Sequence, residues 1–436
     1  MLRLVLTAAA SLAVLLFSSP EALAQTPVAA SSSENEQTPL EMRADQVVEL
    51  LNGEVEPVDI FNNAFLTAVP STQFKAIATQ LTSQFGAAIA VVTLEPPSGD
   101  QAVLEVRMER AIAKGSITID PANDNRVSGL LFRTFAPIND TPAKIEADLE
   151  ALSGDVTWWF GPLDGNSPPI LSSGSDRQMP IGSAFKLYVL ATLAREVADG
   201  KRAWSDTITL ADKRSFPSGM MQDWPKDAPV TLHTLASMMI SISDNTATDA
   251  LVDELGREAI FETLKEGGHS RPELNDPFLK TRELFLLKAG PEERIRTYLR
   301  GTPEVRQQIL DGIKDEDLSA SEVQAAFSGA PIALDIEWFA SANDIAKLMT
   351  YIRERADPVA LEIMAINPSM LENMRAKWLY SGYKGGSEPG VLNLSWLLTS
   401  TDGRDYALIL NQRDDDVRFD PSALELIAQR LLSLER

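Results

Sequence analysis

A serine and a lysine three residues apart, Ser183 and Lys186, have the spacing in this chain that best suits catalysis. They open an amphipathic run, 183–200, that predicts a helix, and residues i and i+3 of a helix lie on the same face. The hydroxyl and the amine then lie one turn apart, where the amine can take the hydroxyl proton. Because a serine needs an adjacent base to become a good nucleophile, this pair predicts an activated serine that requires no histidine.

The composition of the chain excludes several kinds of chemistry. It has no cysteine, so thiolate catalysis and cysteine-bound metals are ruled out, and it has only two histidines. Asp and Glu number 62 against 39 Lys and Arg; the net charge of −23 argues against nucleic acid and anionic membrane surfaces as partners. We expect a small-molecule substrate, with no metal and no cofactor.

The first 24 residues have the pattern of a secretory signal peptide. Arg3 precedes an apolar stretch, 4–17, that is too short to span a membrane, and Ala-Leu-Ala at 22–24 is typical of a cleavage site. Residues 25–38 are rich in Ser, Thr, Ala and Glu and predict a disordered leader. We therefore expect an exported protein, periplasmic or secreted.

Two folded units follow the leader. The first, 39–138, predicts helices before strands and so an α+β domain. Its expected helices are 40–51, 57–66 and 71–85, with Ser71 as N-cap and Gly86 as the stop, and its expected strands are 87–94, 102–111, 115–119 and 127–135. Residues 139–148 are predicted to be a linker, although a helix at 145–152 begins within it.

The second unit, 149–436, predicts a sheet flanked by helices, with an all-helical lobe inserted. Strands are expected at 156–160, 391–399 and 405–411, the last two joined at a hairpin around Asp402-Gly403. Helices are expected at 183–199, 232–242 and 422–434, with a charged helical stretch at 291–327.

Three short motifs occur in order within this second unit. They are Ser183-x-x-Lys186, Ser243-Asp244-Asn245 and Lys384-Gly385-Gly386-Ser387. The flanking segments that strengthen the pattern include Pro217-Ser218-Gly219 and Ile240-Ser241-Ile242. Together they resemble the penicillin-recognising serine hydrolases, specifically the class A β-lactamase-like branch. From residue 149 onward, the resemblance implies a β-lactamase/transpeptidase-like fold, with an antiparallel sheet, flanking helices and a helical lobe.

The resemblance implies a catalytic role for four residues. Ser183 is the nucleophile, and Lys186 is the acylation base once its pKa is lowered by burial and nearby cations. Ser243 relays a proton to the leaving nitrogen. Lys384 supplies a positive charge for the substrate carboxylate and lowers the pKa of the Ser243–Lys186 pair.

Substrate-binding roles follow for four further positions. Gly385 and Gly386 let the strand backbone approach the substrate closely. The N–H groups of Ser183 and Ser387 form the oxyanion hole, and Asn245 donates to the amide side chain of the substrate.

The sequence departs from the family pattern at two places. Gly385 stands where the family most often has threonine or serine, so one hydroxyl donor is lost. Laying 272–275 (Pro-Glu-Leu-Asn) on the family's loop puts Arg271 where the deacylating glutamate belongs. Glu273 is then the candidate base only if this loop is shifted.

Two longer sequence segments, 276–285 and 384–390, resemble a subgroup of exported class A-like serine hydrolases. The subgroup carries an extra N-terminal domain of the NTF2/steroid-isomerase-like type, which fits the predicted unit 39–138. Three functions stay open: hydrolysis of β-lactams or related esters, D,D-peptidase or esterase activity on another acyl donor, and penicillin binding without turnover.

Overall fold

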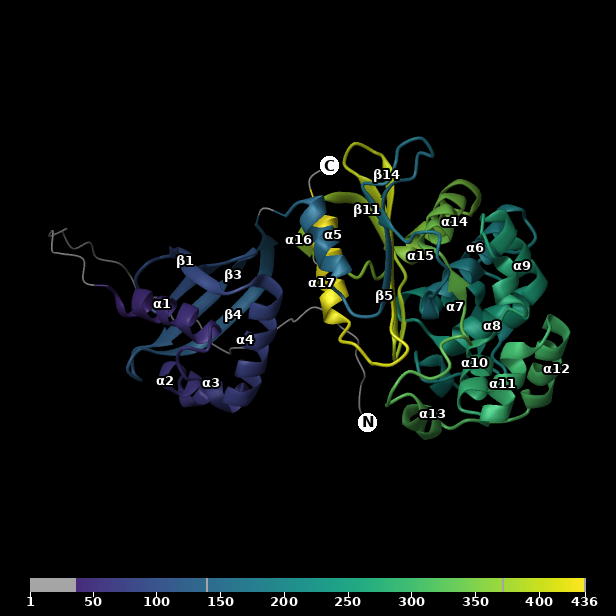
Figure 1. Ribbon diagram of the computed structural model, residues 1–436, viewed down its shortest axis with the longest axis horizontal. Helices are drawn as coiled ribbons and strands as arrows, with labels where there is room; N and C mark the ends of the chain where they lie inside the picture. Colours follow the sequence, from purple (N-terminus) through teal and green to yellow (C-terminus); the bar gives the residue numbers. More distant parts are fainter. Residues whose placement is uncertain (1–36, 139, 371, 435–436) are drawn as a thin grey trace. The chain divides into compact units, whose positions relative to one another are not determined.

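The computed structural model describes residues 37–138, 140–370 and 372–434, which form two compact units that divide between Thr141 and Pro142 (Figure 1). The predicted signal peptide and all but the last two residues of the leader lie outside the described ranges. Thr38, predicted to be disordered, instead caps the first helix through a capping box with Glu41. None of the helices within the described ranges has the length and apolarity that crossing a bilayer requires.

The first unit places helices before a four-stranded antiparallel sheet. The elements are α1 (Pro39–Leu51), α2 (Pro57–Ile60), α3 (Asn63–Ala68), α4 (Ser71–Phe85), β1 (Ala88–Glu95), β2 (Gln101–Met108), β3 (Ala111–Asp120) and β4 (Arg126–Pro137). The strands pair in chain order. α1 buries Leu40, Ala44, Val47 and Leu51, the stripe expected of a helix with one apolar face.

Several details of the first unit differ from the sequence prediction. The strand expected at 102–111 ends at Met108, and the next strand begins at Ala111 rather than at 115. The helix expected at 57–66 is two short helices, because the Asn62 side chain accepts a hydrogen bond from Phe65 N and starts α3 anew. Ser71 is the first residue of α4 rather than its cap, which is Pro70. Gly86 ends the helix as predicted, at φ +78°.

The second unit is built on a six-stranded antiparallel sheet. Its strands are β5 (Asp155–Pro162), β6 (Leu171–Ser173), β11 (Trp378–Tyr383), β12 (Gly386–Glu388), β13 (Val391–Ser400) and β14 (Asp405–Arg413). They run in the order β11-β13-β14-β5-β6, and β12 also pairs with β13. Short strands β7 (Met179–Pro180) and β10 (Phe339–Ala340) pair with each other, as do β8 (Thr207–Thr209) and β9 (Pro229–Thr231).

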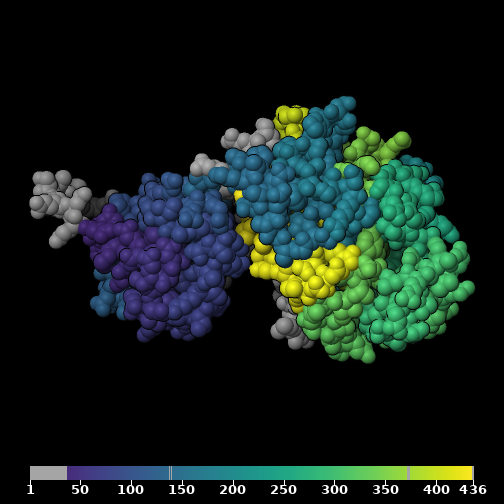
Figure 2. Space-filling model, in the orientation of Figure 1, coloured from purple at the N-terminus to yellow at the C-terminus, as the bar shows by residue number. Residues whose placement is uncertain are grey.

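Helices cover both faces of this sheet. One face packs on α5 (Pro142–Glu150) and α17 (Ser422–Ser433), and the other faces α6 (Lys186–Ala198) and α14 (Ala342–Arg355) (Figure 1). Figure 2 shows the first and last segments of the unit, blue and yellow, side by side on the visible face. With both faces covered, β13 and β14 are buried along almost their whole length.

The remaining helices of the second unit form the helical lobe and its connections. They are α7 (Leu232–Ser241), α8 (Asn245–Leu255), α9 (Arg257–Glu266), α10 (Thr281–Lys288), α11 (Glu292–Arg300), α12 (Pro303–Ile313), α13 (Ala320–Ala326), α15 (Val359–Met364) and α16 (Glu372–Arg375). The connections of the unit include three short 3-10 helices: η1 (Gly182–Phe185), η2 (Met221–Asp223) and η3 (Pro272–Asn275). α6 runs through the core, with every residue from Lys186 to Ala194 buried.

Helix α5 begins earlier than the sequence predicts, within the expected linker. Ile145 and Leu149 are fully buried in the cluster that contains α17. This apolar contact makes residues 142–148 part of the second unit rather than a free connection.

Candidate active site

Ser183 and Lys186 lie at the junction of η1 and α6. Ser183 is on the 3-10 turn and Lys186 is the first residue of α6, so the predicted continuous helix begins one turn late. Phe185 stacks on Trp338 with ring centroids 3.7 Å apart, which anchors this turn in the core. Ser183 is partly exposed, whereas the side chain of Lys186 is wholly buried.

The amine of Lys186 is held by three oxygens. Its Nζ lies 2.7 Å from the Ser243 carbonyl oxygen, 2.7 Å from Asn245 Oδ1 and 3.1 Å from Ser243 Oγ. Burial first, and then the charge of Lys384, lower the pKa of Lys186 well below its usual value. A neutral amine donates its two N–H groups to the two nearer oxygens and keeps its lone pair to accept a hydroxyl proton.

Ser243 connects two lysines. It lies between α7 and α8, and its Oγ is 3.1 Å from Lys186 Nζ and 3.1 Å from Lys384 Nζ. Its φ of +59° belongs to the left-handed region that side chains other than glycine rarely adopt. Backbone strain of this kind persists where surrounding contacts hold it, which is typical of functional positions.

Asp244 supplies those surrounding contacts. One carboxylate oxygen caps α8 by accepting from Ala247 N at 2.9 Å, and the other accepts from Met220 N and Met221 N at 2.7 and 2.8 Å. No catalytic or binding role was predicted for Asp244. The sequence did indicate a helix-capping role, because aspartate is favoured at the position directly before a helix begins.

Lys384 lies between β11, at the edge of the sheet, and β12. Its side chain is buried, and its Nζ donates to Ser243 Oγ and to the carbonyl of Gly385. Burial lowers the pKa of Lys384 to about 7. The positive charge predicted to be fixed is therefore one that titrates near neutral pH.

Close packing between the η1 turn and β12 requires glycine at 386, after Lys384, and at 182, before Ser183. A Cβ on Gly386 would overlap the backbone nitrogen of Ser183, and one on Gly182 would lie 3.0 Å from Ser387 N. The backbone N–H groups of Ser183 and Ser387 are thus brought into one small region, as an oxyanion hole requires.

Gly385 has a different neighbour. A Cβ there would overlap the Tyr383 hydroxyl and approach the Asn393 carbonyl oxygen to 2.9 Å. The hydroxyl residue common in the family at this position does not fit beside Tyr383, which gives a physical reason for the departure.

Asn245 is engaged within the protein. It is 3% exposed; its Oδ1 accepts from Lys186, and its Nδ2 donates to the Phe216 carbonyl at 3.0 Å. These contacts make it a residue that positions the base. Its predicted contact with substrate stays a prediction.

Among the described residues, the Glu273 side chain forms no hydrogen bond or ion pair with the residues around Ser183. It lies on η3 with its side chain 59% exposed, and among the described residues its side chain pairs only with Arg271. Hydrogen bonding to Arg271 lowers the pKa of Glu273, so it is an exposed, ionised carboxylate. Asn275 fixes the loop through hydrogen bonds to the Phe339 backbone at both N and O.

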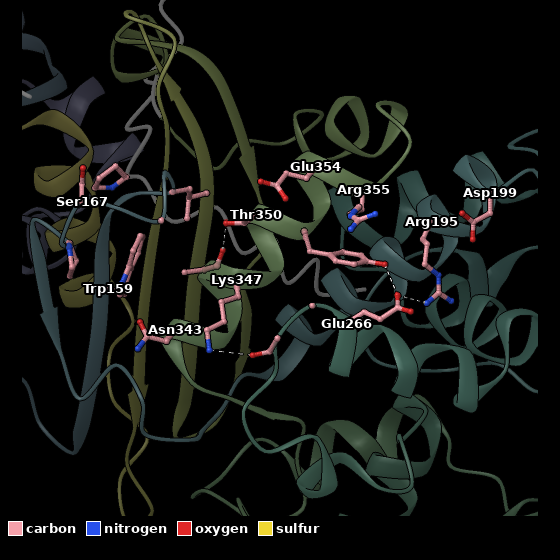
Figure 3. Close-up of a pocket in the computed structure, with 18 residues that line it drawn as sticks. Trp159, Ser167, Arg195, Asp199, Glu266, Asn343, Lys347, Thr350, Glu354 and Arg355 are labelled. Carbon is pink, nitrogen blue, oxygen red and sulfur yellow. Dashed lines mark hydrogen bonds and ion pairs between the residues drawn. The ribbon is translucent and has the colours of Figure 1, made fainter.

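A separate groove of about 980 Å³ runs along α14 (Figure 3). In this view Ser167 and Trp159 lie on one side of Lys347, and Arg195 and Asp199 lie on the other. The Glu266 carboxylate accepts a hydrogen bond from Arg195 at 3.0 Å and another from the Tyr351 hydroxyl at 2.9 Å. None of the four predicted catalytic residues lines this groove.

The arrangement around Ser183 has the parts needed for acyl transfer: a hydroxyl, a buried amine of lowered pKa, a bridging hydroxyl, a second amine, and two backbone N–H groups. Among the described residues, no cluster of three or more His, Cys, Asp or Glu could hold a metal ion.

The match to known proteins agrees with this class of site. Residues 141–429 match the beta-lactamase enzyme family, and the chain belongs to that family of serine hydrolases. No curated protein sequence matches the chain.

Several solved structures resemble the second unit. A beta-lactamase from Sphaerobacter thermophilus is 21% identical over 67% of this chain and 95% of its own, with a TM-score of 0.46. PBP-A is 19% identical over 67% of this chain and 92% of its own, with a TM-score of 0.45. A beta-lactamase from Francisella tularensis is 12% identical over 67% and 97%, with a TM-score of 0.47.

Proposed function

We propose that the protein hydrolyses β-lactams or related esters and amides through an acyl-serine intermediate at Ser183. The observation that carries this proposal is the placement of Ser243 Oγ, 3.1 Å from both Lys186 and Lys384. That hydroxyl can pass a proton between a base beside the nucleophile and a leaving group on the substrate.

The proposed acylation step uses these groups in order. Neutral Lys186 takes the proton of Ser183, whose oxygen bonds to the carbonyl carbon of the substrate. The negative oxygen that forms is stabilised by the N–H groups of Ser183 and Ser387. As the C–N or C–O bond breaks, the proton returns from Lys186 through Ser243 to the leaving atom.

A Ser183→Ala variant tests the proposal directly. Wild type should form a covalent adduct with a fluorescent penicillin and turn over a chromogenic cephalosporin, whereas the variant should do neither. Cephalosporin turnover by the variant at the wild-type rate would disprove the proposed function. Thermal unfolding of both proteins controls for loss of fold.

A second candidate function is favoured by the position of Glu273. Because its carboxylate is exposed and paired with Arg271, no glutamate of the predicted loop is supported as the base for releasing the acyl group. Slow deacylation would fit a D,D-peptidase or esterase acting on another acyl donor, or a penicillin-binding module. A stable penicillin adduct with turnover of a D-Ala-D-Ala peptide would select the peptidase, and an adduct without any turnover would select the module.

Finer assignments belong to the same proposal. The ordered motifs support a place in the class A branch, and four helices ahead of an antiparallel sheet support an NTF2-like first unit. The sequence pattern of residues 1–24 supports export to the periplasm or the medium. The proposed partner is a small-molecule acyl substrate.

A further inference from the structure

Three ionisable side chains that the proposed reaction does not use are buried together in the second unit. Lys288 ends α10, Glu337 precedes β10, and Glu388 is the last residue of β12. Their side chains are 0%, 2% and 10% exposed. Lys288 forms an ion pair with Glu388, and its Nζ is 3.8 Å from Glu337 Oε1. Burying three such groups is unfavourable unless they satisfy one another, so their placement calls for a reason.

Glu388 connects the cluster to one proposed oxyanion donor. It directly follows Ser387 on β12, where the two residues pair with Leu392 and Val391 of β13. A shift of the Glu388 backbone therefore moves the neighbouring Ser387 N–H.

Glu337 connects the cluster to the other donor. It directly precedes Trp338, whose ring stacks on Phe185 and whose carbonyl accepts from Ile181 N at 3.0 Å. Ile181 and Phe185 flank Ser183 on either side. The segment that carries Glu337 therefore supports the turn that presents the Ser183 N–H.

From these contacts we infer that Lys288, Glu337 and Glu388 form a buried ionic clamp that sets the separation of the Ser183 and Ser387 N–H groups. The inference rests on the proposed acyl-serine reaction and assigns these three residues a positioning role. An apolar cluster could fill the same space, but it would not orient Glu388 through a charge-assisted hydrogen bond to Lys288.

The protonation of Glu337 gives this clamp a measurable signature. Burial, followed by the charge of Glu388, raises the pKa of Glu337 to about 8, while Lys288 opposes the rise. The charged groups that face it are Lys288 from α10 and Glu388 from β12. Asp335, on its own segment, is paired with Arg413 of β14. As the pH rises through about 8, Glu337 loses its proton, and its negative charge is then repelled by that of Glu388, which loosens the clamp.

A Glu388→Gln variant tests the positioning role. It should lower the rate constant for acylation by penicillin about tenfold or more, because misplacing one oxyanion donor weakens the stabilisation of the transition state. Glu388→Asp, which keeps the charge, should recover part of the loss. The matched control is Asp405→Asn, which breaks the Arg353–Asp405 ion pair elsewhere in the unit and should leave acylation unchanged.

A Glu337→Gln variant tests the titration. In wild type, the backbone amide resonances of Ser183 and Ser387, followed by NMR with isotope-labelled serine, should show a transition with a midpoint near pH 8. In the variant this transition should be absent, while the separate transition of Lys384 near pH 7 should remain. Because the measurement needs no substrate, it separates the two proposals. Resonances that stay fixed in wild type through this range overturn the clamp, whatever the activity.

The kinetic outcomes are separable as well. Wild type that penicillin does not label would disprove the proposed function, and the amide titration would still decide the clamp. Normal labelling of wild type, with equally fast acylation of a stably folded Glu388→Gln, would disprove the clamp and leave the proposed function intact.

Discussion

Lys186 and Lys384 converge on a single oxygen, each with its Nζ 3.1 Å from Ser243 Oγ. Two ammonium groups this close repel each other, and both are buried, so the site favours the state in which one amine is neutral. Burial and then the charge of Lys384 lower the pKa of Lys186, and burial lowers the pKa of Lys384 to about 7. The proposed reaction uses Lys186 in its neutral form as the base and Lys384 in its protonated form beside an anionic substrate.

Replacing Lys384 with alanine should move the pH dependence of acylation. Lys186 must be neutral to act, so the rate rises with pH through the pKa of Lys186. Because the charge of Lys384 helps to lower that pKa, removing it should shift the acidic limb to higher pH. The profile of kcat/KM against pH measures this shift; an acidic limb at its wild-type position would contradict the coupling.

Loss of the Lys384 proton should also be visible in wild type. For substrates with a carboxylate, kcat/KM should fall as the pH rises through about 7. An ester substrate without a carboxylate should lack this limb. Equal alkaline limbs for the two substrates would mean that Lys384 does not bind the carboxylate.

Restoring the hydroxyl common in the family, by Gly385→Thr, should destabilise the protein. The added Cβ overlaps the Tyr383 hydroxyl and crowds the Asn393 carbonyl, and overpacking of this kind costs about 1–3 kcal/mol. Urea unfolding measures the loss. Gly312→Ala on α12 is the control, because nothing lies within 4 Å of its Cβ position, and it should not lower the free energy of unfolding. A stable Gly385→Thr variant with improved substrate binding would refute this account.

Glu273→Gln should leave the deacylation rate within about twofold of wild type, since exposed surface substitutions usually have small effects. The carboxylate is exposed and paired with Arg271, away from the contacts that hold Lys186 and Ser243. Single-turnover release of a penicilloyl adduct measures the rate. A large fall in deacylation would show that the loop moves to bring Glu273 to the acyl group.

Asp344→Asn should lower the free energy of unfolding by about 1–3 kcal/mol at neutral pH, the range for leaving buried donors poorly satisfied. The Asp344 carboxylate accepts from Ser341 N, Ser270 N and Gln178 Nε2 at 3.0, 2.9 and 2.6 Å. Burial alone would raise its pKa, but these hydrogen bonds lower it below the usual value.

The sign of the pH effect follows from that lowered pKa. The stabilisation is present above the pKa of the unfolded aspartate, about 4, and is lost as the pH falls through the folded pKa. Wild type and variant should therefore converge in stability in strong acid. The control is Asp311→Asn, which changes an exposed carboxylate on α12. A difference in the free energy of unfolding between wild type and Asp344→Asn that stays constant at all pH values would contradict the expectation.

Several features could be predicted from the sequence because they depend on neighbours along the chain. The apolar runs of β13 and β14 and the stripe of α17 mark elements that must be buried, whatever packs on them. The order of the Ser183, Ser243 and Lys384 motifs was enough to suggest the family to which the chain belongs.

Some boundaries were not predicted. The helix expected at 57–66 is divided because the Asn62 side chain caps α3, through a local hydrogen bond that competes with the continuing helical backbone. The helix predicted at 145–152 begins at Pro142 instead, and its buried residues Ile145 and Leu149 pack in the α17 cluster, a contact between segments distant in the sequence.

Spacing along the chain is enough to place a serine and a lysine one turn apart, ahead of two further motifs. Only the folded protein shows that Lys186 and Lys384 share the Ser243 oxygen, that Asn245 holds the base, and that Glu273 pairs with Arg271 at the surface. The physical reason is that pKa and reach depend on burial and on charges brought together from distant segments, whereas spacing along a chain fixes only which residues can share a turn.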